Sequence, residues 1–142
     1  MDRSYDELKE RELVPFLAAF AADVDMVMTA HIQYPQIESG TYMSISTGEE
    51  IYLPATLSKT YLTDIVREDM GYQGVIVTDG MQMGAMTQNF DPYDTAVLAI
   101  NAGVDMLLEP ITSWSSEDIE AIRIFDHIYL KASKHIRHFI IW

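Results

Sequence analysis

The fold of this chain is decided by one stretch, Gly74-Val-Ile-Val-Thr-Asp-Gly-Met81. Its apolar centre, bounded by glycines, predicts a parallel strand that is buried on both faces. The strand stops at a carboxylate, Asp79, which is followed at once by Gly80. Chemistry in α/β proteins collects where parallel strands end, so Asp79 is a candidate nucleophile or charge stabiliser. The alternative interpretation is structural, because an aspartate can also cap the helix that follows it.

Two further stretches predict strands of the same sheet, Asp25 to His31 and Val104 to Glu109. Apolar residues at helical spacing occupy three other segments: residues 5–22, a segment that opens at the N-cap candidate Ser58 and closes at Gly71, and residues 92–102. This order describes successive βα units and a parallel sheet with right-handed crossovers. The sequence therefore predicts an α/β fold in which about three parallel strands are flanked by helices.

Two segments lie outside this regular pattern. Residues 34–56 are rich in turn residues and predict an extended loop at the carboxyl edge of the first strand. Long loops at that edge are usually functional. Ser115, with Asp118 three residues later, resembles a capping box and predicts a C-terminal helix within residues 112–142.

The three predicted strands end in ionisable residues, His31, Asp79 and Glu109. Because the carboxyl ends of parallel strands meet at one edge, this pattern predicts one wall of an active site. For His31 the alternative is a structural histidine whose ring is satisfied by neighbouring groups. For Glu109 the alternative is an ordinary strand exit, since Pro110 follows it.

Composition excludes several classes of protein. The chain has 142 residues, of which 49% are hydrophobic and 22% charged, as is typical of one globular domain. No stretch approaches the ~20 apolar residues of a membrane-spanning helix, so no membrane insertion is expected. The formal charge of −13 disfavours nucleic acid and anionic membranes as partners. There is no cysteine, and the four histidines fit no zinc pattern, so no metal is expected.

Several stretches in succession resemble one known family: Ala22 to Pro35, Leu53 to Ser58, Gly71 to Met81, Met83 to Met86, and Ala102 to Leu108. Their order is similar to the second half of the catalytic domain of glycoside hydrolase family 3. The most similar branch is that of the bacterial β-N-acetylglucosaminidases (β-N-acetylhexosaminidases). The resemblance covers roughly residues 5–111 and fades after Pro110.

The resemblance implies a TIM-type barrel of which these strands are the sixth, seventh and eighth. Residues 1–142 would then form a single partial (β/α) barrel with a divergent C-terminal end. It also implies that Asp79 is the nucleophile of a retaining hydrolase acting on N-acetylglucosaminides, such as cell-wall muropeptides or chitin oligosaccharides. His31, Met81 and Met83 would contact the sugar. The resemblance implies no cofactor and no metal.

The general acid/base is the main departure from the family pattern. In this branch its work resembles that of a His–Asp pair in a Lys-His-Phe-Pro-Gly-His type loop after the fifth strand, and this sequence has no such segment. We therefore expect a fragment that is inactive on its own. One alternative is an inactive remnant or sugar-binding module. Another, reached without the family, is a receiver-like domain with Asp79 as phosphoacceptor.

Three strands cannot close a barrel, which needs eight strands of matched tilt. Open strand edges recruit other chains, so we expect a homo-oligomer or an association with the missing barrel half. The other expected partner is the carbohydrate substrate. The sequence does not choose between a cytoplasmic and an exported location, because any signal would lie upstream of it.

Overall fold

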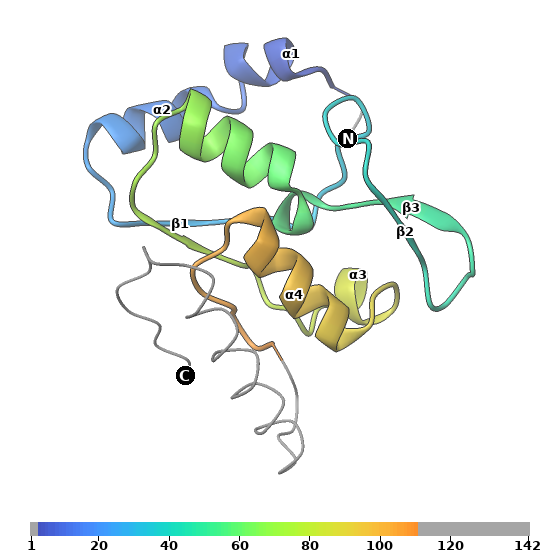
Figure 1. Cartoon of the computed structure of the whole chain (residues 1–142). Coiled ribbons are helices and arrows are strands. Elements are labelled where there is room, and N and C mark those ends of the chain that lie inside the picture. Colours follow the sequence, from blue (N-terminus) through green and yellow to red (C-terminus); the bar gives the residue numbers. More distant parts are fainter. Residues whose placement is uncertain (1–2, 111–142) are drawn as a thin grey trace.

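The computed structural model describes residues 3–110, and at its centre two short strands run in parallel. Strand β1 (Met26–Met28) pairs with β4 (Val75–Val77), so that Val27 lies opposite Ile76. Helices α1, α2 and η2 gather on one side of this pair and α3 and α4 on the other (Figure 1). The predicted α/β fold with parallel strands is confirmed. The helix expected within residues 112–142 lies outside the described residues.

The third predicted strand, over residues 104–109, is reduced to a single bridge. Met106 pairs with Val77 in the parallel sense, and the Thr78 N–H donates to the Met106 carbonyl at 3.0 Å. Beyond this point the Thr78 hydroxyl accepts from the Leu108 N–H at 2.9 Å, so a side chain takes the place of a backbone partner. Glu109 then turns the chain away with a φ of 51°. The prediction of a full strand is therefore wrong, although the segment does run beside β4.

The helix predicted over residues 5–22 is two helices, α1 (Tyr5–Glu10) and α2 (Val14–Ala21). A capping box formed by Ser4 and Glu7 opens α1. Pro15 lies in the first turn of α2, where its missing N–H costs nothing. A proline at this place begins a helix and does not continue one, so the prediction of a single helix is wrong.

The long loop over residues 34–56 contains structure that the sequence interpretation missed. Strands β2 (Thr41–Met43) and β3 (Glu50–Tyr52) form an antiparallel hairpin that reaches away from the rest of the protein (Figure 1). The short helix η1 (Ala55–Leu57) follows it. The loop is anchored by Glu38, a buried carboxylate that accepts from the Gly40 N–H at 2.6 Å and from the Ser58 hydroxyl.

The two longer helices, η2 and α4, lie where the sequence predicts them, so both predictions are confirmed. Helix η2 (Thr60–Asp69) begins after Ser58, whose hydroxyl accepts from the Tyr61 N–H at 3.0 Å. This helix is wound wider than an α-helix, and the Met70 N–H donates to a carbonyl five residues back. Helix α4 (Pro92–Ala102) is capped by Asp91 and ends at Gly103, which has a φ of 111°. The short helix α3 (Gly84–Thr87) lies between β4 and α4.

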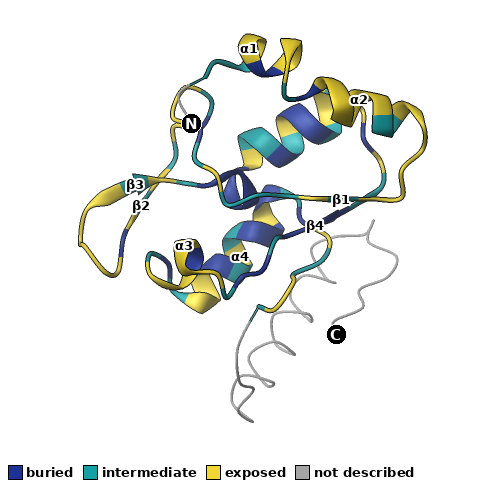
Figure 2. Ribbon diagram, turned by 180° about the vertical axis from the view of Figure 1, so that it is seen from behind, coloured by how far each residue is buried: buried dark blue, intermediate teal, exposed yellow. Residues whose placement is uncertain are grey.

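Burial is uneven across the protein. The main hydrophobic core surrounds β4 and consists of Leu57, Leu62, Val66, Tyr72, Ile76, Met81, Met86, Phe90, Ala99, Ala102 and Val104. A smaller core joins α1 to η2 and consists of Leu8, Leu13, Tyr34, Ala55 and Ile65. Figure 2 shows that β1 and α2 are mostly exposed. The residues after β4 therefore stand on the best-packed part of the chain.

Candidate active site

The carboxyl ends of β1 and β4 lie at the same edge, because the two strands are parallel and Met28 stands opposite Val77. The chain continues from β1 to His31 and from β4 to Asp79. The two continuations meet directly, since His31 Nε2 lies 3.0 Å from the Gly80 carbonyl oxygen. The structure therefore brings together the strand ends that the sequence singled out.

Asp79 is a partly exposed carboxylate at the end of β4. Its Oδ1 accepts a hydrogen bond from the N–H of Gly80 at 2.7 Å. The next helix, α3, begins at Gly84 with Met83 as its N-cap residue and without a side-chain cap. The alternative interpretation of Asp79 as the cap of this helix is therefore wrong.

His31 is partly buried, and both of its ring nitrogens have partners. Nδ1 lies 2.9 Å from the Thr56 hydroxyl, and Nε2 contacts the Gly80 carbonyl. The Thr56 hydroxyl in turn lies 2.9 Å from that of Thr29. The imidazole thus links the residues after β1, the helix η1 and the turn after β4.

The two methionines proposed for the sugar site lie in different environments. Met81 is buried in the main core with 4% of its surface exposed, whereas Met83 is 49% exposed. In this structure only Met83 can offer its side chain to a ligand without repacking. Substrate contacts by either residue stay predictions.

Glu109 is exposed and lies over the turn after Asp79. Its Oε2 is 3.4 Å from the position that a Cβ on Gly80 would occupy, and its carbonyl accepts from Gln82 Nε2 at 3.2 Å. The strand ends at His31, Asp79 and Glu109 therefore come together around Gly80.

The sequence interpretation missed Thr56, which is completely buried yet bonded through its hydroxyl to His31. The signal was present, because Leu53-Pro-Ala-Thr-Leu-Ser58 places one hydroxyl between apolar residues in a stretch that ends the long loop. A buried hydroxyl needs a hydrogen-bond partner, and such a partner is often a functional side chain.

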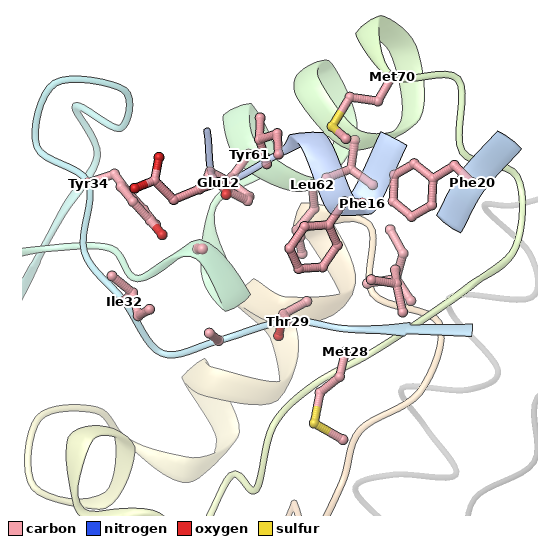
Figure 3. Close-up of a pocket in the computed structure, with 16 residues that line it drawn as sticks. Glu12, Phe16, Phe20, Met28, Thr29, Ile32, Tyr34, Tyr61, Leu62 and Met70 are labelled. Carbon is pink, nitrogen blue, oxygen red and sulfur yellow. The ribbon is translucent and has the colours of Figure 1, made fainter. Parts of the chain in front are cut away.

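An apolar cavity of about 330 Å³ lies elsewhere, between α2, η2 and β1. Figure 3 shows Phe16, Phe20, Leu62 and Met70 gathered there, while Met28 projects away from them. Burial raises the pKa of Tyr61, which lines the cavity, above its ordinary value. Neither Asp79 nor His31 lines this cavity, so the candidate active site is the strand edge and not the cavity.

Other kinds of site were sought within residues 3–110. No group of three or more histidine and acidic side chains in this range could hold a metal ion. In the same range no helix combines the length and the apolar character needed to cross a membrane.

The parallel strands define an α/β protein, and a partly exposed carboxylate lies at their carboxyl edge, where candidate active sites of such proteins are found. The chain belongs to glycosyl hydrolase family 3, whose N terminal domain it matches over residues 1–129. This finding confirms the family resemblance. Membership of this family is at odds with a receiver-like domain, whereas the role of Asp79 stays a prediction.

Similar proteins carry hexosaminidase names. The chain is 38% identical over 121 residues to Beta-hexosaminidase A of Pseudoalteromonas piscicida. The aligned residues cover 84% of this chain and 20% of that protein. It is 34% identical over 106 residues to a Beta-hexosaminidase of Stenotrophomonas maltophilia strain K279a, covering 75% of this chain and 28% of that one. The chain thus spans between a fifth and three-tenths of the length of these relatives.

Solved structures agree with the sequence relatives. The glycoside hydrolase family 3 β-N-acetylglucosaminidase of Paenibacillus sp. str. FPU-7 superposes with a TM-score of 0.65 at 27% identity, covering 100% of this chain and 29% of that one. The β-N-acetylglucosaminidase of Thermotoga maritima gives a TM-score of 0.64 at 30% identity, covering 92% and 25%. The chain is therefore a β-hexosaminidase-like portion of the family's N terminal domain.

Proposed function

We propose that this chain carries the nucleophile of a retaining β-N-acetylglucosaminidase and that Asp79 is that nucleophile. The observation that supports this most is the position of the Asp79 carboxylate: partly exposed, at the carboxyl end of β4, and not used as a helix cap. In the first step a carboxylate oxygen attacks the anomeric carbon while the bond to the leaving oxygen breaks. In the second step water replaces the carboxylate and releases the sugar.

The proposal assigns β1, β4 and the segment around Met106 to the sixth, seventh and eighth strands of a (β/α)₈ barrel. Support comes from their order in the chain, their parallel pairing and the bridge between Val77 and Met106. The superposed β-N-acetylglucosaminidases are three to four times as long as this chain, as expected if it corresponds to part of their barrel. The substrates proposed are N-acetylglucosaminides, in line with the names of those structures.

The proposed reaction lacks one participant in this sequence. Retaining hydrolysis needs a general acid to protonate the leaving oxygen and a base to activate water, and this contribution is typically ~10²–10⁴-fold. No Lys-His-Phe-Pro-Gly-His type segment occurs in the 142 residues. The same observation favours a second candidate function, an inactive remnant or sugar-binding module that retains part of the cleft.

An activated substrate separates the two candidates. Dinitrophenolate leaves without protonation, so a 2,4-dinitrophenyl N-acetylglucosaminide bypasses the missing acid in the first step only. A covalent glycosyl adduct should then accumulate on Asp79, detected by intact-mass and peptide mass spectrometry, and should be absent from Asp79→Asn. Turnover of an ordinary nitrophenyl N-acetylglucosaminide should stay low. An adduct elsewhere, or rapid turnover by Asp79→Asn, would contradict the proposal, and no adduct at all would favour the second candidate.

Assembly is part of the same proposal. Within the described residues β1 pairs only with β4, and Met26 and Met28 on it are 44% and 51% exposed. We propose that this side is covered by association, either with a second copy or with a complementary barrel half. An obligate interface of this kind buries above roughly 2,000 Å² in total. Light scattering should show an oligomer, and a stable monomer at micromolar concentration would contradict association with a second copy.

A further inference from the structure

The hydrogen bonds at the strand edge form a chain whose direction can be assigned. A carbonyl oxygen only accepts, so the contact between His31 Nε2 and Gly80 O at 3.0 Å requires that Nε2 carry the proton. In a neutral imidazole the other nitrogen, Nδ1, is then an acceptor. For the neutral ring, Thr56 then donates its hydroxyl proton to Nδ1, across 2.9 Å.

The same reasoning extends one residue further. The Thr56 hydroxyl has a single proton, and His31 uses it, so Thr29 is the donor in the 2.9 Å contact between the two threonine hydroxyls. Thr56 is completely buried and cannot exchange these partners for water. The order of donation is thus Thr29 to Thr56, Thr56 to His31, and His31 to Gly80.

This series of hydrogen bonds ends at the peptide group between Gly80 and Met81, directly after Asp79. The carbonyl of the Gly80–Met81 peptide accepts from His31 and from the Met83 N–H, each at 3.0 Å, and the N–H of this peptide donates to the Leu108 carbonyl at 2.9 Å. The preceding peptide contributes the Gly80 N–H that donates to Asp79 Oδ1. A glycine has a soft backbone, so the orientation of these two peptides depends on the groups that hold them.

We propose that His31 is a positioning residue: in its Nε2–H tautomer, oriented by Thr56, it fixes the Gly80 turn that aims the Asp79 carboxylate. This assignment rests on the proposed role of Asp79 as nucleophile. It replaces a direct contact of the imidazole with the sugar, because both ring nitrogens are used within the protein. A carboxylate displaced by 1 Å from its line of attack loses on the order of 10²-fold in rate.

The test uses the whole chain and a matched pair of variants at Thr56. Thr56→Ser keeps the hydroxyl, whereas Thr56→Val keeps the shape and removes the donor. Long-range ¹H–¹⁵N NMR should show the Nε2–H tautomer of His31 in the unaltered chain and in Thr56→Ser. In Thr56→Val the Nδ1 signal and the Gly80 amide signal should shift. His31→Gln serves as a second variant if Thr56→Val fails to fold.

The second readout is the rate at which Asp79 is labelled by the dinitrophenyl glycoside. It should fall on the order of 10²-fold in Thr56→Val and in His31→Gln, and stay near the unaltered rate in Thr56→Ser. An Nδ1–H tautomer, or a Gly80 signal indifferent to Thr56→Val, would overturn the positioning role. If the unaltered chain is never labelled, the proposed function fails instead, and the NMR comparison alone decides whether His31 holds the turn.

Discussion

The two strands of the parallel pair, β4 and β1, differ in how far the rest of the chain covers them. Strand β4 lies between β1 and the segment at Met106, and its central residue Ile76 is completely buried. Strand β1 has β4 as its single strand partner within the described residues, and Met26 and Met28 are about half exposed. Helix α2, which lies near β1, contains no buried residue although it is almost entirely apolar. Figure 2 shows the contrast along the chain.

This difference shows that the apolar character of a side chain does not by itself bury it; burial also needs other elements that pack against it. The apolar side chains of β4 are covered by η2, α4 and the hydrophobic core that these helices share. The side chains of β1 and α2 have the same apolar character but are less covered inside residues 3–110. Val27 and Phe20 pack against the main core and are partly buried, whereas Met26 and Met28 are exposed. The proposed nucleophile follows the covered strand, so its position is fixed by packing that this chain supplies itself.

The largest expected effect compares one residue from each strand. Ile76→Ala removes a completely buried side chain from the main core and should lower the free energy of unfolding by about 2–5 kcal/mol. Met28→Ala removes a side chain that is 51% exposed and should change it by no more than about 0.5 kcal/mol in the monomer. Urea denaturation of both variants measures the contrast.

Equal losses from Ile76→Ala and Met28→Ala would mean that β1 is covered in solution. A concentration-dependent loss in Met28→Ala alone would locate that cover in another copy of the chain.

The next largest effect on stability is expected at Gly74, where the pairing of β1 with β4 begins. A Cβ on Gly74 would lie 2.7 Å from the Asp25 carbonyl oxygen, which accepts from the Val75 N–H at the start of the pairing. Backbone atoms cannot move aside cheaply, so Gly74→Ala should cost about 1–3 kcal/mol. Gly84→Ala is the control, because its Cβ would meet only the end of the flexible Gln88 side chain. We expect that variant to be neutral or slightly stabilising in the same urea titration, and a loss equal to that of Gly74→Ala would contradict the argument.

The sequence predicted strand β4 and the two longer helices well, and it predicted the segments around them less well. The run Val75-Ile76-Val77, the N-terminal residues of η2 and α4, and the meeting of His31 with the turn after Asp79 follow from local patterns. The break between α1 and α2 depends on one proline, and the hairpin β2–β3 on pairing within a segment that has no strong alternation. The shortening of the third strand depends on a single side chain, Thr78, which accepts the hydrogen bond of Leu108.

The stability of the fold at alkaline pH tests the hydrogen bond between α1, on the less covered side, and η2. The Tyr5 hydroxyl donates to Asp69 of η2, and burial followed by this hydrogen bond raises the pKa of Tyr5 to about 12. A raised tyrosine pKa stabilises the fold fully below pH 10, and this contribution is lost as pH rises from 10 to about 12. Because Tyr5 is only partly buried, solvent screening weakens this contribution, and we expect a loss within about 1 kcal/mol, measured by urea denaturation across this range. In Tyr5→Phe this part of the pH dependence should disappear; if it stays, another group causes it.

The smallest expected effect on stability belongs to Asp79 itself. Its carboxylate accepts a hydrogen bond from the N–H of the adjacent Gly80, and an asparagine oxygen can accept the same bond. Asp79→Asn should therefore leave the free energy of unfolding within about 0.5 kcal/mol of the unaltered value. Asp91→Ala is the contrasting variant, because Asp91 caps α4 through the Tyr93 N–H at 2.9 Å, and losing a cap costs about 0.5–2 kcal/mol. A melting temperature that falls as far in Asp79→Asn as in Asp91→Ala would show a structural carboxylate. An unchanged melting temperature, together with the loss of glycosyl labelling, would leave chemistry as the reason for an acid at the end of β4.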